Sequence, residues 1–331
     1  GSPPREPTAP APCVLQEKGP ATLQTSAEPS RGEEPRPTMN STDRDEPELI
    51  SVSGGRSSGL MLRMLLDQWG GQLPSSKLAI FANTGEEAEG TLIFVREIAE
   101  RWNVPIRWVE FQREPVPGAA FDDVAHFREV DYCNASRKGE PFDAMVDWKR
   151  YLPNPTQRLC TTWLKVRAAL GLAASLGFPI KRIDTGKPGK PRIETFADFD
   201  QHLGIRADEP RRVAKNRPKP DVRMPLVDAG ITRADVLAFW RAQPFDLAIR
   251  PGEGNCVDCF EKGLAQLVNV ARAAPDDSRI NRWIAREERI GSTVKKGRSY
   301  ADIRDVARRQ LPMLQDTPGE ETELLPCACG D

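Results

Sequence analysis

The chain has 331 residues, which is long enough to bury a sizeable core in one large domain or two. Its formal net charge of −1 excludes an overall positive field that would draw the whole molecule onto nucleic acid or a membrane. No apolar run reaches the roughly 18 residues that a spanning helix needs, and the first residues do not form a secretory signal. We therefore expect a cytoplasmic protein without a membrane partner.

The ends of the chain differ in composition from its middle. Residues 1–46 are rich in Pro, Ala, Ser, Thr and Glu without an apolar period, which is typical of a disordered tail. Residues 47–248 carry the alternating strands and helices of an α/β domain. Residues 249–315 contain a cysteine loop and predicted helices, and we expect residues 316–331 to be a flexible Cys-x-Cys tail.

The first predicted element is a short apolar strand that ends in a serine–glycine–glycine turn. Gly54 and Gly55 permit a tight turn and the close approach of a ligand, and an apolar helix follows at once. Ser57 and Ser58 suit the start of that helix, where free N–H groups and the helix dipole attract an anion. The segment predicts a phosphate cradle made of Ser53, Gly54, Gly55, Arg56, Ser57 and Ser58.

Two further strands are expected downstream. An apolar run that begins at Lys77 and ends in turn residues predicts a buried parallel strand. Glu86 and Glu87 favour the start of the next helix, and a third strand is predicted at Ile106–Phe111. This order of elements predicts a doubly wound, mostly parallel α/β sheet, followed by a helical, cysteine-bearing C-terminal extension. Ligands of such sheets bind at the carboxyl ends of the strands.

A cysteine opens a later core helix. Cys160 stands at the start of a helix that is predicted to run to about Leu176. Arg158 and Lys165 are its basic neighbours in the sequence. A thiol at a helix N-terminus beside positive charge is expected to have a lowered pKa and to bind metal readily.

Basic residues gather in two segments beyond this helix. A predicted strand at Ile180–Asp184 leads into a Gly-, Pro- and Lys-rich loop at Gly186–Arg192, of the kind that forms a mobile insertion. Residues 206–223 contain seven basic and three acidic residues. Arginine suits bidentate recognition of oxyanions, so we interpret Arg206 and its neighbours as a clamp on phosphate or sulfate. A solvated charged loop is the alternative interpretation.

Seven cysteines without a secretory signal indicate metal or redox chemistry rather than a disulfide scaffold. Cys256 and Cys259 are spaced to share one metal or cluster in a glycine-rich loop. Cys160 is the best candidate for a third ligand, and Cys133 is a possible fourth. Three uses of these thiols remain open: an iron–sulfur cluster, a structural zinc site, or free or redox-active thiols.

The strand–SGG–serine–helix unit resembles the pyrophosphatase loop (PP-loop) of the adenine-nucleotide α-hydrolase-like superfamily. In the usual S-G-G-x-D-S pattern an aspartate stands where this chain has Ser57. The segments Phe-Ala-Asn-Thr-Gly-Glu and Gly-Ile-Arg, with the cysteine pattern, resemble the phosphoadenosine phosphosulfate (PAPS) reductase-like family. This resemblance implies that backbone groups at the end of the second strand hold an adenine, at Phe81, Ala82, Asn83 and Thr84.

The resemblance also implies an ATP pyrophosphatase-type enzyme of sulfur metabolism. An acceptor oxygen would attack the α-phosphorus of ATP, pyrophosphate would leave with Mg²⁺ as its counter-ion, and sulfur would then displace the adenylate. The implied catalytic residues are Lys165, Arg206 and Cys160. The cysteine pattern implies a [4Fe–4S] cluster on Cys160, Cys256 and Cys259. Either Cys133 is the fourth ligand, or three cysteines hold the cluster and one iron is open to sulfide or a substrate atom. The implied partners are a sulfur donor protein such as a cysteine desulfurase, and a nucleic acid or small molecule as acceptor.

Two other functions fit the same residues. The first is a reductase of adenylyl sulfate or phosphoadenylyl sulfate, which would bind that nucleotide in place of ATP. The Cys327–Cys329 tail lacks the Glu-Cys-Gly-His pattern that carries the nucleophilic thiol of those reductases. The second is a nucleotide-binding subunit without catalysis, which the Ser57 replacement favours.

Overall fold

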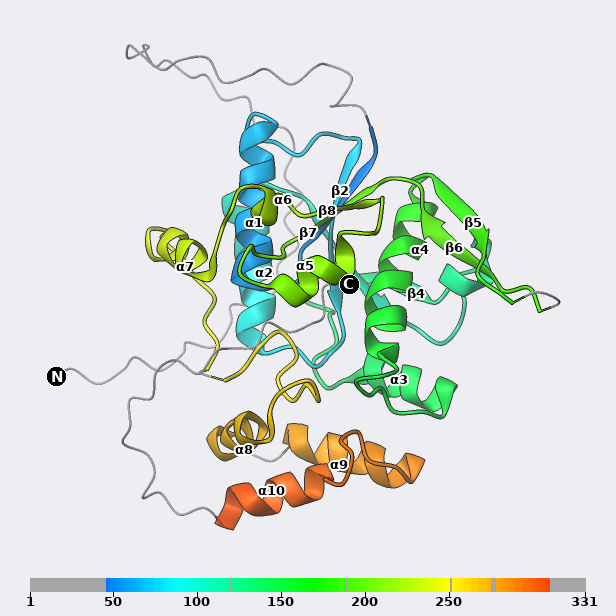
Figure 1. Ribbon diagram of the computed structural model, residues 1–331, viewed down its shortest axis with the longest axis vertical. Helices are drawn as coiled ribbons and strands as arrows, with labels where there is room; N and C mark the ends of the chain where they lie inside the picture. The colour runs from blue at the N-terminus through cyan, green and yellow to red at the C-terminus, as the bar shows by residue number, and fades with distance from the viewer. Residues whose placement is uncertain (1–45, 120, 188–189, 251, 275–277, 310–331) are drawn as a thin grey trace. The chain divides into compact units, whose positions relative to one another are not determined.

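The computed structural model describes residues 46–119, 121–187, 190–250, 252–274 and 278–309 (Figure 1). The predicted disordered residues 1–45 and the Cys-x-Cys tail at 316–331 lie outside the described residues. Within the described ranges, no helix is both long and apolar enough to cross a membrane.

A six-stranded sheet organises the described chain. Its strand order is β4-β3-β2-β1-β7-β8, and every neighbouring pair is parallel except β3 and β4. The sheet confirms the predicted α/β class with a mostly parallel sheet. The strands are β1 (Glu48–Ser51), β2 (Lys77–Asn83), β3 (Ile106–Phe111), β4 (Phe127–Val130), β7 (Asp200–Leu203) and β8 (Val222–Arg223).

Helices cover both faces of this sheet because its strands are apolar on both sides. Ile50 and Phe81 belong to one core, which they share with α1 (Arg56–Gln68), α2 (Glu89–Arg101) and α7 (Arg233–Arg241). Their strand neighbours Leu49 and Ile80 face a second core with α4 (Ala168–Ser175). Near-continuous apolar strands buried on both faces are the pattern of a parallel sheet between helical layers.

The helix predicted from Cys160 is present in two parts. Its first half, η3 (Cys160–Arg167), is π-helical, and α4 continues it. π-helical segments are rare and often lie at functional sites. The remaining helices before the cysteine loop are short or peripheral: η2 (Asp122–Val124), α3 (Glu140–Lys149), α5 (Pro210–Asn216) and α6 (Pro225–Asp228).

The C-terminal extension is helical, as the sequence predicts. It contains α8 (Leu264–Ala273), α9 (Ser278–Ile290) and α10 (Tyr300–Arg309). Trp283 and Tyr300 of this extension share a core with Phe142 of α3 and Leu164 of η3. The extension therefore packs against the elements that precede and contain Cys160.

One predicted boundary is wrong. Glu86 and Glu87 do not start a helix, because α2 begins at Glu89. Instead, the Glu87 carboxylate accepts hydrogen bonds from the amide and hydroxyl of Thr84, at 2.9 and 2.8 Å. Glu86 is fully buried in an ion pair with Arg286. The residues Thr84–Ala88 thus form a closed loop after β2, which we call the β2 loop.

A two-stranded antiparallel hairpin lies outside the six-stranded sheet. It consists of β5 (Ile180–Asp184) and β6 (Ile193–Ala197), paired from Ile180↔Ala197 to Asp184↔Ile193. The predicted strand at 180–184 is therefore confirmed. The Gly-, Pro- and Lys-rich segment is the turn of this hairpin, at the right of Figure 1.

Candidate functional site

The predicted phosphate cradle is a turn between β1 and α1. We call Ser53–Ser58 the glycine loop. The Ser53 amide donates to Ser58 Oγ at 3.0 Å, and Ser58 Oγ–H donates to the Gly55 carbonyl at 2.9 Å. Gly54 has φ +76°, and a Cβ there would clash with the Thr91 side chain. The serine side chains thus close a turn that only glycine can make at position 54.

The start of α1 presents backbone donors at this turn. The Gly59 amide bonds to the Gly55 carbonyl at 3.1 Å and is the first amide of the helical ladder. The three amides before it, at Arg56, Ser57 and Ser58, precede that ladder, as in any α-helix. Together with the positive end of the helix dipole they form an arrangement that favours an anion.

Arg206 reaches the glycine loop from the neighbouring strand. β7 ends at Leu203 beside β1, and a Cβ at Gly204 would lie 2.7 Å from Ser58 Cα, so the two segments touch. Arg206 Nη1 then lies 3.4 Å from Ser57 Oγ, and its Nε donates to Asp208 at 2.8 Å. The structure therefore places a largely buried guanidinium at the start of α1.

Arg56 has a different environment from the rest of the cradle. Its guanidinium makes two hydrogen bonds to the Asp246 carboxylate, at 2.7 and 2.9 Å. Its carbonyl accepts the indole N–H of Trp240 at 2.8 Å. The Arg56 side chain thus anchors the glycine loop to the segment after α7. Only the backbone amide of Arg56 is left to contribute to the phosphate cradle.

The residues predicted to hold adenine lie at the end of β2, next to the glycine loop. The Phe81 ring is buried 4.7 Å from the Trp108 ring and near Gly54. The Asn83 side chain is also buried, where it donates to Glu110 at 2.6 Å and to the Ser136 carbonyl at 2.9 Å. These side chains are used inside the protein, so any ligand at this strand end would meet backbone groups.

Three buried thiols gather beside these loops. Cys160 begins η3, whereas Cys256 and Cys259 belong to the segment Gly252–Gly263, which we call the cysteine loop. One contact joins the cysteine loop to the phosphate cradle, and another joins it to the β2 loop. A Cβ at Gly55 would lie 3.2 Å from Asn255 Oδ1, and the Val257 amide donates to the Glu86 carbonyl at 3.1 Å.

The thiols differ in pKa because they interact. The hydrogen bond from Cys256 lowers the pKa of Cys259 to about 7, with a further contribution from Lys262, while the pKa of Cys256 is raised by the same bond. Burial, together with the charge of Cys259, raises the pKa of Cys160 to about 11. The predicted lowering at Cys160 is therefore wrong, because burial outweighs the positive charges of Arg158 and Lys165.

Lys165 is near enough to both Cys160 and the Glu87 carboxyl for its positive charge to act to lower both of their pKa values. Burial nevertheless raises the pKa of Glu87, against the effect of Lys165. Arg206 thus lies at the glycine loop, whereas Lys165 lies near Cys160 and the β2 loop.

Cys133, the predicted fourth ligand, lies elsewhere. It is exposed in the turn after β4, where its amide donates to Asp131 at 2.8 Å. Cys160, Cys256 and Cys259 are free thiols, and no contact in the described part of the chain links Cys133 to them. Among the described residues, no group of three or more Cys, His, Asp or Glu side chains is arranged to hold a single metal ion.

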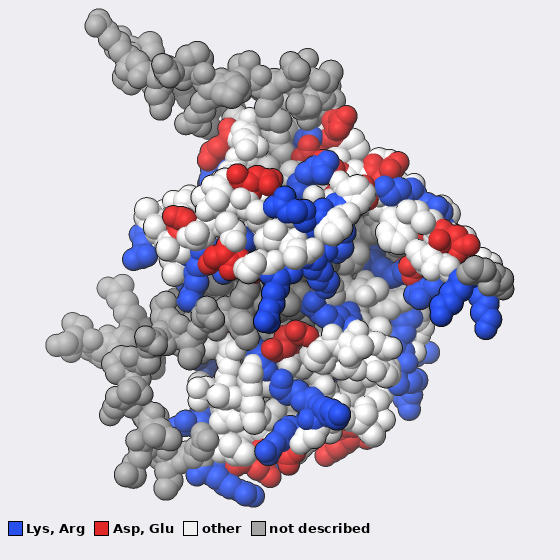
Figure 2. Space-filling model, viewed as in Figure 1, with Lys and Arg blue, Asp and Glu red and all other residues white. Residues whose placement is uncertain are grey.

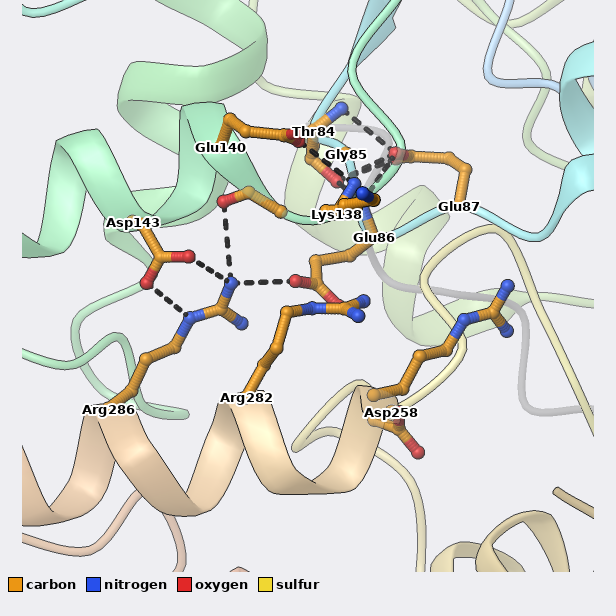
Figure 3. Close-up of polar contacts among 12 residues, drawn as sticks. Thr84, Gly85, Glu86, Glu87, Lys138, Glu140, Asp143, Asp258, Arg282 and Arg286 are labelled. Atoms are coloured by element: carbon orange, nitrogen blue, oxygen red, sulfur yellow. Dashed lines mark hydrogen bonds and ion pairs between the residues drawn. The ribbon is translucent and has the colours of Figure 1, made fainter. Parts of the chain in front are cut away.

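Sequence reasoning missed an arginine face on α9 that fixes the site (Figure 3). Arg286 Nη2 donates to Glu86 at 2.7 Å and its Nε donates to Asp143 at 3.0 Å, with both Arg286 and Glu86 fully buried. The face comprises Arg279, Arg282, Arg286 and Arg289, which meet Glu253, Glu86, Asp143 and Asp147. The helical spacing of these arginines was the available signal.

Comparison with known proteins finds a relative in a phage. The chain is 28% identical over 250 residues to the uncharacterized nin region protein ORF290 of Escherichia phage lambda, across 75% of this chain and 76% of that protein. No family model matches the chain. No solved structure matches it either.

Proposed function

We propose that this chain is a PP-loop enzyme that activates an acceptor with ATP for sulfur transfer. The observation that carries the proposal is the contact between two loops. Asn255 of the cysteine loop lies against Gly55, and the Val257 amide is bonded to the β2 loop at Glu86. An anion cradle beside buried thiols suits a reaction in which a phosphate-activated acceptor meets sulfur.

The cradle would bind the nucleotide through its phosphates. The amides at the start of α1 would hold phosphate oxygens, with the Arg206 guanidinium beside them at Ser57. Mg²⁺ would arrive bound to the same phosphates, since it prefers oxygen ligands. Adenine would then lie along the end of β2, where Phe81–Thr84 offer backbone groups.

The proposed first step needs stabilisation of negative charge. An acceptor oxygen would attack the α-phosphorus, the bond from that phosphorus to the bridging oxygen would break, and pyrophosphate would leave. Arg206 and Lys165 are the cations that would stabilise this charge, because preorganised charges lower the barrier to phosphoryl chemistry. Lys165 also lies near Cys160, which would put the thiols on the acceptor's side of the cradle.

The three thiols are the residues that would hold the iron–sulfur cluster implied by the resemblance. They come from two elements, are buried, and interact electrostatically. In a cubane cluster each cysteine binds a different iron. Cys160, Cys256 and Cys259 would hold such a cluster. It would supply an iron that can bind the sulfur to be transferred.

Pyrophosphate release tests this function. The purified full-length chain is incubated anaerobically with Mg·ATP, a sulfide source and single-stranded or duplex oligonucleotides as acceptor, and the pyrophosphate formed is measured. Ser53→Ala removes the hydroxyl that donates to Ser58 at 3.0 Å, so release should fall. Ser175→Ala removes a helix-end hydroxyl that bonds Leu172, and it is the matched control that should retain activity.

Two outcomes would replace this proposal. Release of sulfite from PAPS with a thiol reductant, and no pyrophosphate from ATP, would identify a reductase. Binding of ATP without turnover in the presence of any sulfur donor would identify a nucleotide-binding subunit, for which Ser57 in place of aspartate is the sequence argument. Equal pyrophosphate release by wild type and Ser53→Ala would remove the glycine loop from the reaction.

A further inference from the structure

The β5–β6 hairpin carries positive charge that the proposed ATP site does not use. Its residues Ile180–Ala197 include five basic and two acidic side chains, in a chain whose net charge is −1. Figure 2 shows lysine and arginine side chains gathered at this hairpin, at the right of the view. The charge is therefore a local feature of the surface and not a property of the whole molecule.

Three of the basic side chains are unneutralised. In the ranges that the structure describes, Arg182, Lys187 and Lys190 are exposed and form no ion pair. Arg182 instead lies 4.2 Å from the Phe121 ring. By contrast, Lys181 is paired with Asp198 and Asp221, at 3.4 and 3.1 Å. Exposed cations without carboxylate partners attract polyanions, because binding releases the counterions of both partners.

The hairpin is anchored to the element that carries Cys160 and Lys165. Thr195 Oγ1 donates to Asp123 at 2.7 Å, and Asp123 also accepts from Arg167 of η3 at 2.8 Å. The other guanidinium nitrogen of Arg167 donates to Glu194 of β6 at 3.1 Å. These bonds fix the hairpin to η3, so a molecule that binds the hairpin would also be fixed relative to η3.

The same hairpin exposes an apolar side chain beside one of these cations. Ile193 is 46% exposed. It shares a face of the hairpin with Arg182, because Thr195, the cross-strand partner of Arg182, is its next-but-one neighbour along β6. An exposed mixture of apolar and basic side chains suits a ligand that alternates flat apolar groups with negative charges, as nucleic acid does.

We propose that the β5–β6 hairpin binds the phosphodiester backbone of a nucleic acid. A two-stranded ribbon fits the major groove of a duplex, and it also offers a basic track to a single strand. That this nucleic acid is also the acceptor of the reaction rests on the proposed function. The binding of nucleic acid does not depend on the proposed function, because the hairpin cations lie outside the ATP site.

Fluorescence anisotropy tests the proposal with labelled single-stranded and duplex oligonucleotides and the full-length chain. The dissociation constant is measured over a series of salt concentrations. Lys187→Ala/Lys190→Ala should weaken binding and reduce the slope of log K against log salt by about one for each lysine. Lys296→Ala/Arg298→Ala removes the same charge from an exposed turn before α10, and should leave the slope unchanged.

Comparison of the single-stranded with the duplex oligonucleotide shows which form of nucleic acid the hairpin binds. Tighter binding of one form identifies it as the ligand, and Lys187→Glu/Lys190→Glu should then abolish that binding. The proposal is overturned if neither form binds, if poly-glutamate binds as tightly, or if both double variants lose the same slope. ATP binding by Lys187→Ala/Lys190→Ala should equal that of wild type. Oligonucleotide binding without ATP binding would refute the proposed function and leave the hairpin proposal standing.

Discussion

The amide of Val257 donates a hydrogen bond of 3.1 Å to the carbonyl of Glu86. This bond joins the cysteine loop to the loop after β2, across 171 positions of sequence (257 − 86). Because Glu86 is itself held by Arg286 of α9, the C-terminal helices fix both loops at once. The contact of Asn255 with Gly55 adds the phosphate cradle to this arrangement, so the cradle and the cysteine loop lie side by side.

Replacement of Gly54 tests the geometry of the cradle. Gly54→Ala should destabilise the protein by about 1–3 kcal/mol more than Gly70→Ala. Both glycines have positive φ, +76° and +79°, but only a Cβ at Gly54 would meet other atoms, those of Thr91. Urea denaturation measures the difference. Equal losses in the two variants would show that the turn has room for a side chain.

Removal of Arg286 tests the buried ion network. Arg286→Ala leaves the buried Glu86 carboxylate without its 2.7 Å partner, and should cost about 3–5 kcal/mol of unfolding free energy. Arg289→Ala is the control on the same helix face, because its side chain is 37% exposed and its pairs are worth about 0–1 kcal/mol. Similar losses in a denaturation experiment would contradict the special role of Arg286.

The Asp143 carboxyl gives the stability a defined pH dependence. Burial would raise its pKa, but the hydrogen bonds and charges of Arg286 and Arg289 outweigh burial and lower the pKa below 3.8. Because the folded pKa is depressed, this stabilisation is complete above about pH 4 and is lost as pH falls through the folded pKa.

Comparison with Asp143→Asn tests that dependence. The stability gap between wild type and Asp143→Asn should be largest near neutral pH and should close in acid, as followed by urea denaturation at several pH values. Asp67→Asn, which alters a carboxylate that is 53% exposed, is the control and should give a small gap. A gap for Asp143→Asn that does not change with pH would show that the arginines leave its pKa unaltered.

The sequence predicted the elements of the site better than their contacts. Apolar runs such as Leu78–Ile80 mark buried strands directly, so the α/β class followed from pattern alone. Glu86 looked like a helix start because acidic residues commonly occupy that position. Its actual role depends on Arg286, which lies 200 residues away, and no local pattern reports such a partner.

The cysteines show the same limit. Their spacing predicted Cys256 and Cys259 as a pair, which the structure places in hydrogen-bond contact. The expected lowering of the Cys160 pKa failed because its burial, which depends on packing with α3 and the C-terminal extension, is not local information. Asn255 was missed for a similar reason: only the fold brings it to Gly55.

Iron content tests the proposed use of the thiols. Protein purified anaerobically should contain iron and acid-labile sulfide, with a broad visible absorption band that dithionite bleaches. Cys160→Ser should lose this band, whereas Cys133→Ser should keep it, because Cys133 is exposed and makes no described contact with the buried thiols. Loss of the band in Cys133→Ser would restore Cys133 as a ligand. One zinc per chain without iron would refute the cluster.

A calorimetric titration of the full-length chain with Mg·ATP measures whether the glycine loop and Arg206 bind a nucleotide. We predict saturable binding of one nucleotide per chain, weakened at least about tenfold in Arg206→Ala, since a hydrogen bond to a charged group is worth about 1.5–3 kcal/mol. Arg223→Ala should bind like wild type, because Arg223 is paired with Asp200 on the edge strand. Absence of saturable binding, or equal weakening in both variants, would contradict the claim that the glycine loop and Arg206 bind a nucleotide.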